Sequence, residues 1–562
     1  MNGIIIAFLV ILIGAINLDF YSLLKGNSKR YWKGQLLRLK IGIIYSAVMA
    51  YIAMPAIIFP DILVPIAILL LINSFITIYE NRNNLALNKN SLKAFKFPIF
   101  VIVAILLFWI LSPLIPLTQT IELHNLPNAK ISNEQLSAVD PSHIRVVPLE
   151  YADWSSDKVI GELGYKVVVG KLTIQIIDGH LYWVAPLESG NFIKWFQFKT
   201  TPGYVIVDAE DENAKAERID NLKLKYMQSA LFQTNLYRHI YQKFPNYRLE
   251  DFTFELDDNK NPKWVVSVVK PTIWFTGEKV YGAIITDPQT GEMEFYELKK
   301  LPEWVDRAMP EKIAEDYNYW YGAYVHGYFN TLVSQKDIHL PTKKRGVIDV
   351  FAVRTDNGLV WFTGHTSPSG LDKSLTGYAT INTRTGEMIY YENVSGYYNE
   401  EAAVSAADSS VSNFAGYYGA QPVFYNLFGE LTWIIPILSN ENNKLQRIAV
   451  VHAETGQVFV KEKLNDVLLD YKKWLESEYQ IVVKGDIDIK KLNQIKGVIE
   501  RIRGDYVVIR SNGAVFNKHI FKIYGPESLI TYEGDYVAIS YRESDEVVVD
   551  SVEFDNLEYE FV

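Results

Sequence analysis

The pattern of hydrophobic positions divides the chain into an apolar first fifth and a mixed remainder. Four apolar runs cover about residues 3–24, 41–59, 62–79 and 97–117. Each run approaches the roughly 20 residues that a helix needs to cross the hydrocarbon core of a bilayer. They predict a four-helix transmembrane domain over residues 1–118, in which Pro60-Asp61 joins the second and third helices as a tight hairpin.

The charges between these runs predict an orientation. Six basic residues and no acid lie between the first two runs, and four basic residues lie between the last two. Positive loops stay in the cytoplasm, so we expect a multi-pass protein of the cell membrane whose C-terminal domains are extracytoplasmic. Asp19 lies inside the first run near Lys25, and we interpret it as an acid near the cytoplasmic headgroups. The alternative is a functional acid within the membrane.

After residue 118, positions alternate as in half-buried strands, and one strand–turn–strand pattern recurs. Its turn contains Thr-Gly in three copies, at Gly291, Gly386 and Gly456, because glycine supplies the positive φ that a tight hairpin needs. A first, degenerate copy that lacks Thr-Gly starts near Gly203.

A tryptophan strand precedes each copy, and a helical pattern precedes the later copies. The repeat tryptophans are Trp183, Trp274, Trp361 and Trp433. One of the predicted helices opens at Asn399, with Glu400 and Glu401 in its first turn. Self-similarity at this spacing indicates a tandem α+β array in which each unit is a helix followed by an antiparallel sheet.

The closing hairpin Asp287-Pro-Gln-Thr-Gly-Glu292, after a helix and strands, resembles the PepSY domain. The copy ending at Glu387 lacks the acid, and the copy ending at Gln457 has Gln in place of Glu. The resemblance covers about residues 200–465. It implies a bacterial, membrane-attached binding or protease-modulating module, and it carries over no catalytic residue.

The predicted fold class is therefore α+β, in six units. The last unit has five short strand candidates separated by glycine turns, which suggests a small, OB-like β-barrel. The units are the transmembrane domain 1–118, a degenerate module 119–220, PepSY-like repeats 221–305 and 306–395, a repeat with a helical connector 396–482, and the barrel 483–562.

Composition narrows the chemistry. The chain has 562 residues, a net charge of −10 and no cysteine, which excludes thiolate chemistry and disulfides. The negative charge argues against nucleic acid as a partner. No metalloprotease, nucleophile-elbow or Walker motif is present, so we expect no enzyme, no cofactor and no metal site.

Weaker candidates for chemistry remain open. The acidic loop Asp208–Glu212 is a candidate Ca²⁺ site without EF-hand spacing. His326 and His365 are the histidines we expect to approach one another as a metal pair. Asp287 and Glu292 are a candidate acid–base pair, although turn capping is the simpler interpretation.

Aromatic residues are the remaining signal. Residues 317–329 place aromatic side chains all round a helix, which is typical of a buried or interfacial helix. The candidate interface residues are Tyr317, Trp320, Tyr324 and Tyr328. We expect a bilayer-anchored scaffold for binding or assembly at the bacterial surface, as a homo-oligomer or with an envelope or cell-wall partner. The alternatives are a regulator of an envelope protease and an accessory subunit of a transporter.

Overall fold

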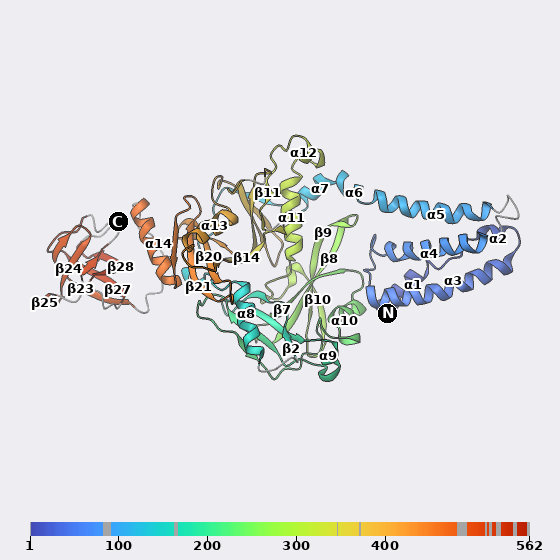
Figure 1. Cartoon of the computed structure of the whole chain (residues 1–562), viewed down its shortest axis with the longest axis horizontal. Helices are drawn as coiled ribbons and strands as arrows, with labels where there is room; N and C mark the ends of the chain where they lie inside the picture. The colour runs from blue at the N-terminus through green and yellow to red at the C-terminus, as the bar shows by residue number, and fades with distance from the viewer. Residues whose placement is uncertain are drawn as a thin grey trace.

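The computed structural model describes residues 2–82, 92–161, 167–344, 347–369, 372–479, 492–511, 514–515, 520–523, 530–542 and 548–558. Figure 1 shows an elongated molecule with apolar helices at one end and the N-terminus among them. Mixed helix and sheet fills the middle, and a small β-domain lies at the other end. These three parts follow one another in the order of the chain.

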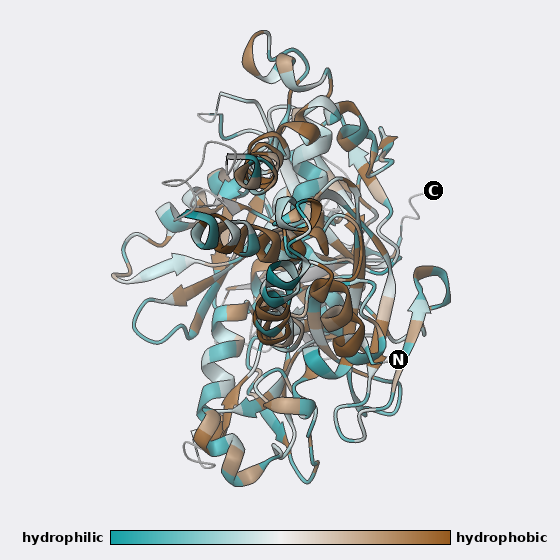
Figure 2. Cartoon of the chain, turned by 90° about the vertical axis from the view of Figure 1, so that its right-hand side faces the viewer, coloured by the Kyte–Doolittle hydropathy of each residue, from teal (hydrophilic) through white to brown (hydrophobic). Residues whose placement is uncertain are grey.

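Three helices are long and apolar enough to cross a membrane. The first is α3 (Ser28–Val48) with the π-helical turn η1 (Met49–Ala53) that continues it, and the others are α4 (Leu63–Asn81) and α5 (Leu92–Leu111). They match the second, third and fourth predicted runs. Viewed from their end, the helices form an apolar bundle at the centre of the molecule (Figure 2).

The first predicted run is not a single spanning helix, and this corrects the prediction. It forms a ten-residue helix, α1 (Gly3–Leu12), and a short helix, α2 (Phe20–Leu24), with non-helical chain between them. Side chains satisfy the backbone there: Asn73 donates to the Gly14 carbonyl at 2.7 Å and Gln35 donates to the Ala15 carbonyl at 2.7 Å. The sequence shows the length of the apolar run, but it does not show that side chains from other helices bond to the backbone of the break.

Two charged residues of this region are buried in the bundle. Arg38 is in α3 rather than in a loop, and it is fully buried, donating to Thr77 at 2.8 Å and to Glu80 at 2.8 Å. Asp19 is buried in the bundle and caps α2 by accepting from the Ser22 backbone N–H at 3.1 Å. Arg30 lies 3.9 Å from the same carboxylate, and the position of Asp19 near the headgroups stays a prediction.

Four modules follow, each a helix and then an antiparallel sheet. The helices are α8 (Leu149–Ile160), α10 (Leu236–Lys243), α11 (Glu311–Ala323) and α13 (Glu400–Ser410). The first module also has its own helix, although its turn lacks Thr-Gly. The strands are β2 (Val167–Val169), β3 (Thr173–Ile177), β4 (His180–Ser189), β5 (Tyr204–Asp208) and β6 (Glu217–Ile219); β7 (Arg248–Leu256), β8 (Pro262–Ile273), β9 (Thr276–Thr286) and β10 (Met293–Glu297); β11 (Leu340–Pro341), β14 (Phe351–Thr355), β15 (Gly358–Thr366), β16 (Gly377–Asn382) and β17 (Met388–Tyr391); and β18 (Tyr417–Gly419), β19 (Val423–Leu427), β20 (Glu430–Ser439), β21 (Leu445–His452) and β22 (Val458–Lys461).

The long central strand of each sheet pairs with a hairpin partner on one side and with the next strand on the other. The orders are β2-β4-β5-β6 with β3 on β4, β10-β9-β8-β7, β1-β17-β16-β15-β11 with β14 on β15, and β18-β20-β21-β22 with β19 on β20. The smaller elements are η6 (Phe232–Thr234), η7 (Leu298–Lys300), β12 (Lys343–Lys344), β13 (Val347–Ile348), α9 (Phe192–Phe198) and α12 (Tyr328–Leu332).

The segment between the last spanning helix and the first module runs along later modules. After α6 (Leu114–Thr118) and α7 (Thr120–Asn125), strand β1 (Lys130–Ser132) pairs in parallel with β17 of the third sheet. The Val139 N–H then donates to the Asn426 carbonyl of the fourth sheet at 2.9 Å. Residues that we assigned to the first module thus complete the third.

The tail forms a closed sheet. Strands β23, β27, β28, β26 and β24 follow one another, and pairing of β23 with β24 closes the ring, while α14 (Leu464–Tyr479) packs against β21 and β22. A strand was expected at residues 528–532; residues 528–529 lie outside the described residues, and 530–532 are not strand. The tail strands are β23 (Leu492–Arg503), β24 (Tyr506–Ser511), β25 (Ala514–Val515), β26 (Ile520–Lys522), β27 (Tyr536–Arg542) and β28 (Val548–Asn556).

Candidate metal centre

Two histidines and a glutamate converge from three segments of the first module. His143 ends the 3₁₀ turn η4 (Pro141–His143), which begins where Asp140 accepts from the Ser142 N–H at 2.8 Å. His180 is the first residue of β4, after a tight turn. Glu210 follows β5, in a turn where Asp208 accepts from the Glu210 N–H at 2.8 Å. Local capping thus aims all three side chains at one point.

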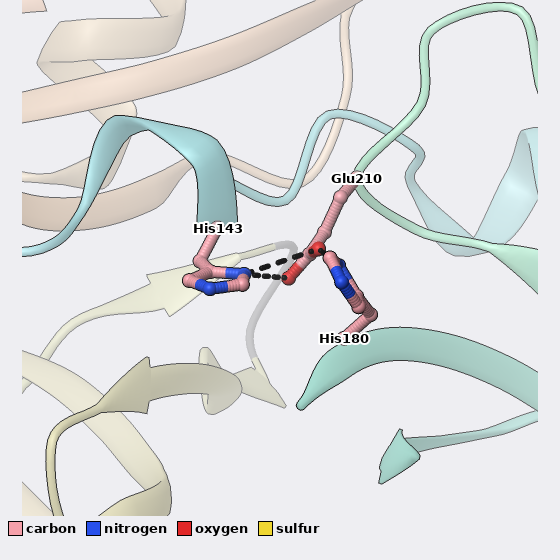
Figure 3. Close-up of side chains that lie close together, drawn as sticks. All are labelled: His143, His180 and Glu210. Atoms are coloured by element: carbon pink, nitrogen blue, oxygen red, sulfur yellow. Dashed lines mark hydrogen bonds and ion pairs between the residues drawn. The ribbon is translucent and has the colours of Figure 1, made fainter. Parts of the chain in front are cut away.

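The Glu210 carboxylate lies between the two imidazole rings (Figure 3). The Nδ1 atom of His143 is 3.3 Å from each carboxylate oxygen, and Nδ1 of His180 is 2.7 Å from Oε2. The three potential ligand atoms all lie within 4.8 Å of one another. The side chain of Glu210 is 6% exposed and that of His180 is 53% exposed, so the cluster opens to solvent on the His180 side.

The donor set decides which ion fits. Two imidazole nitrogens and one carboxylate match the three-ligand zinc sites that keep a fourth position open. Imidazole also suits other first-row divalent metals. Calcium is a poor fit because it takes six to eight oxygen ligands. A site for a first-row divalent metal therefore replaces the predicted Ca²⁺ site. Among the described residues, Glu210 clusters with two histidines and not with the other acids of its loop.

An arginine from another module completes the surroundings. Arg354 on β14 lies 3.3 Å from Oε1 of Glu210 through its Nη1, which also donates to the Gly179 carbonyl. This contact joins the first and third modules. Arg354 also balances the charge of Glu210 when no ion is bound, so a metal would compete with it for one carboxylate oxygen.

The repeat tryptophans occupy one equivalent position, with one correction. Trp264, not Trp274, is the member from the second module. In the sheet, each of the four tryptophans lies opposite the residue that comes immediately before the turn of its hairpin. Each also donates its indole N–H to a backbone carbonyl in the segment that leads into the helix of its module. The pairs are Trp183 to Val147 (2.8 Å), Trp264 to Tyr226 (3.0 Å), Trp361 to Met309 (2.8 Å) and Trp433 to Tyr398 (2.9 Å).

Trp274 instead belongs to the joint with the apolar helices. It has φ 59° at the end of β8. Its ring centroid lies 5.3 Å from that of Phe59 and 5.7 Å from that of Phe108. The sequence pattern around Trp274 resembles the other copies, but Trp264 lies near the start of β8 and Trp274 directly follows its end, and only the strand register tells them apart.

The three turn glycines lie at φ 78°, 74° and 72° for Gly291, Gly386 and Gly456, in the turns where the repeat pattern expects them. Asp287 accepts from the Gln289 and Thr290 N–H groups of its turn at 2.8 and 3.0 Å. Its other oxygen is 2.7 Å from Lys263, and these contacts hold the pKa of Asp287 below its usual value despite partial burial. Asp287 is thus a turn cap paired with lysine.

The aromatic helix lies mostly inside the chain. Tyr317 and Trp320 of α11 are each 6% exposed and belong to a core to which all four modules contribute. They cannot form a subunit interface, which corrects the prediction for these two residues. Tyr324 and Tyr328 are half-buried.

The predicted histidine pair is also different. His326 bonds to Asp337 at 2.8 Å, and His365 meets His339 instead, with 2.9 Å between the two Nδ1 atoms. Burial lowers the pKa of His339 to about 4 and that of His365 well below its usual value. Both rings are therefore neutral, and Nε2 of His365 bonds to Asn318 at 2.9 Å. This is a buried structural pair.

A buried acid pair escaped the sequence reasoning because its members are 51 positions apart. Glu255 accepts from the Asp306 N–H at 2.8 Å, and Asp306 accepts from the Ile176 N–H at 2.6 Å. Burial raises the pKa of Glu255 to about 7. Burial, followed by the charge of Glu255, raises the pKa of Asp306 well above its usual range.

No protein-family model and no curated protein matches this chain. Solved structures do match at low similarity. An exo-1,5-alpha-L-arabinanase from a bovine ruminal metagenomic library is 11% identical, with 57% of this chain and 85% of that chain covered and a TM-score of 0.16. An endo-arabinase from Bacteroides thetaiotaomicron is 11% identical over 51% and 76%, with a TM-score of 0.18. A Trypanosoma rangeli sialidase is 10% identical over 67% and 53%, with a TM-score of 0.17.

These matches overturn one expectation. We expected a protein that is not an enzyme, and the solved structures that match are named as enzymes. We therefore no longer exclude that the chain is an enzyme. TM-scores below 0.2 support neither a reaction nor a substrate for it.

Proposed function

We propose that this chain is a membrane-anchored platform of the bacterial cell surface, whose four modules bind another component of the envelope or further copies of the chain. The modules lie outside the membrane in this proposal, as the basic segments between the apolar runs favour. Their likeness to PepSY modules, which are binding modules, is part of the same proposal.

One observation carries it, namely the joint between the apolar helices and the second module. Arg248 at the start of β7 pairs with Asp61 between the second and third predicted spans, and Tyr241 of α10 donates to the Pro55 carbonyl at 2.7 Å. The Ile57 N–H donates to the Pro245 carbonyl at 2.7 Å. A joint with this many directed contacts supports a fixed presentation of the array rather than a tethered domain.

Purification of the tagged chain in mild detergent, followed by mass photometry and identification of associated proteins, tests the platform. We expect a discrete complex, either of several copies or with a stoichiometric envelope protein. An associated protease would favour the regulator, and an associated transporter would favour the accessory subunit. A single species at 64.4 kDa plus micelle, with no associated protein and no response to concentration, would contradict the proposal.

A second candidate function, binding of a divalent metal ion, is favoured by the convergence of His143, His180 and Glu210. Zn²⁺ is the best match to the donor set. The coordinating nitrogens must be unprotonated, so acidification should weaken binding.

Titration of the detergent-solubilised chain with Co²⁺, followed by visible absorption, tests this candidate. We expect ligand-field bands that Zn²⁺ displaces and that His180→Ala abolishes. His326→Ala is the matched control, because His326 is also a solvent-exposed histidine paired with an acid but lies outside the cluster. Equal binding by the two variants, or none by the parent chain, would leave Glu210 as a purely structural link to Arg354.

A further inference from the structure

Helix α9 presents an apolar surface to its surroundings. Four of its side chains and the neighbouring Phe232 are exposed, and we call this surface the α9 patch: Phe192, Ile193, Phe196, Phe198 and Phe232. The buried ring of Trp195 holds it in place, with centroids 5.1 Å from Phe196 and 5.9 Å from Phe232. Soluble surfaces rarely leave such a group of aromatic side chains uncovered.

The α9 patch adjoins the end of a predicted span. Arg238 donates to the Phe232 carbonyl at 2.7 Å through Nη1. The same guanidinium donates to the Tyr51 carbonyl through Nε and Nη2, both at 3.3 Å. Tyr51 lies in η1, the last turn of the first helix that is long enough to cross a membrane. The Arg238 side chain therefore links the α9 patch to the end of this span.

A second apolar surface lies beside the end of another span. Its members, which we call the α12 patch, are Phe329, Leu332, Val333 and Ile121. The Tyr328 N–H at the start of α12 donates to Oγ1 of Thr120 at 2.9 Å. Thr120 lies two residues beyond α6, which follows the last spanning helix. This patch therefore also lies close to where the chain leaves the span.

Figure 1 places the two helices on opposite sides of the apolar bundle, α12 at the top and α9 at the bottom, both at the end of the array that faces the bundle. Figure 2 looks at this end and shows apolar residues in the highest and lowest helices of the molecule, with the bundle between them. The two patches thus lie on opposite sides of the bundle, at the end of the array that faces it.

The charges near both patches suit a phospholipid surface. Lys194 and Lys199 lie on or next to α9, and the chain has no acid from residue 189 to residue 207. Lys336 follows α12, and the acids that adjoin this patch are Asp337, which pairs with His326, and Glu122 beside Ile121. Short helices with aromatic and lysine residues lie in the interfacial region of bilayers, where the bases attract anionic headgroups.

We infer that both patches insert into the leaflet that faces the array, at the boundary between headgroups and acyl chains, so that the array rests on the bilayer at two places beside its anchor. This inference rests on the membrane anchoring of the proposed function. The occupant is the bilayer itself, because each patch continues the surface of a spanning segment and is edged by lysine. A second copy of the chain is the competing occupant.

The absence of cysteine allows a direct test, because each single-cysteine variant carries one spin label without background. The full chain is reconstituted in nanodiscs of phosphatidylcholine and phosphatidylglycerol, with labels at Phe192→Cys, Ile193→Cys, Phe329→Cys or Leu332→Cys. Collision of each label with oxygen and with a water-soluble nickel chelate is measured. Ile44→Cys on the exposed face of α3 is the lipid control, and Asn442→Cys in the exposed β20–β21 turn is the water control.

The patch labels should resemble Ile44→Cys, with oxygen collisions exceeding nickel collisions, and this ratio should reverse at Asn442→Cys. Patch labels that resemble Asn442→Cys while Ile44→Cys remains in lipid would overturn the inference and leave the anchoring intact. Low collision with both reagents, together with label–label coupling between copies, would identify a second copy as the occupant and also overturn it. A water-like label at Ile44→Cys would instead refute the membrane anchoring itself.

Discussion

Arg248 of the second module forms a two-pronged ion pair with Asp61 of the apolar bundle: its Nε and Nη2 atoms lie 2.7 and 2.6 Å from the two carboxylate oxygens. A third donor of the same guanidinium, Nη1, reaches Glu278 at 2.5 Å. The Arg248 side chain is 18% exposed and that of Asp61 is 15% exposed, so water screens this pair only in part.

The first prediction concerns this ion pair. Asp61→Asn removes the charge that Arg248 faces, and a hydrogen bond to a charged group contributes about 1.5–3 kcal/mol. We expect faster amide hydrogen exchange in β7 and α10, measured by mass spectrometry on the detergent-solubilised chain. Glu297→Gln, which breaks an exposed pair with Lys300, is the control and should change little. Equal exchange in both variants would mean that the joint does not depend on the ion pair.

The second prediction separates Trp264 of β8 from Trp274, which directly follows that strand. Trp264→Phe leaves the Tyr226 carbonyl without its indole donor, which costs about 1–3 kcal/mol of unfolding free energy. Trp274→Phe is the matched control, because its indole N–H has no partner among the described residues. Urea unfolding followed by circular dichroism measures both. A larger loss for Trp274→Phe would restore the original assignment of Trp274 to the repeat.

The third prediction ranks the turn glycines. A valine at any of the three would be strained at φ 72–78°, at about 1–3 kcal/mol each. At Gly291 and Gly456 an added Cβ would also overlap the rings of Tyr226 and Tyr398, whereas at Gly386 the nearest atom is Sδ of Met309 at 3.5 Å. Thermal unfolding should therefore show Gly386→Val as the mildest of the three. Equal losses would mean that backbone strain alone sets the cost.

The fourth prediction is a pH dependence from Glu255. Its pKa is raised in the folded chain to about 7, from 4.5, so the folded chain holds a proton that the unfolded chain releases. The unfolding free energy should therefore fall as the pH rises from about 5 through about 7, by up to about 3 kcal/mol. Urea midpoints across this range measure it. Glu255→Gln should make the profile shallower, with Asp306 and Glu400 supplying the remaining slope because burial raises both of their pKa values, whereas the exposed Glu294→Gln should leave it unchanged.

Features set by neighbouring residues could be predicted from the sequence. Asn399 caps α13 by accepting from the Ala402 N–H at 3.0 Å, with Glu400 and Glu401 in the first turn, because capping needs only local partners. Three of the four apolar runs form helices of spanning length for the same reason, since length and composition are local properties.

Features set by distant contacts could not be predicted. The acidic turn of Glu210 was visible in the sequence, but His143 and His180 lie 67 and 30 positions from it and join it only through the packing of their two segments. In the sequence, Arg38 is one of several bases in a positive segment. Its buried position depends on Thr77 and Glu80 of α4, about 40 positions away, to which it donates hydrogen bonds. The break after α1 escaped detection because its apolar residues continue through it.

The pairing of β1 with β17 has a consequence for synthesis. Lys130 pairs with Ile389, so this strand must wait for 259 further residues to be made before its partner exists. During that interval the segment beyond the anchor presents an unpaired strand that other chains can join. The third sheet is therefore completed by a strand that is made before any strand of the first two modules.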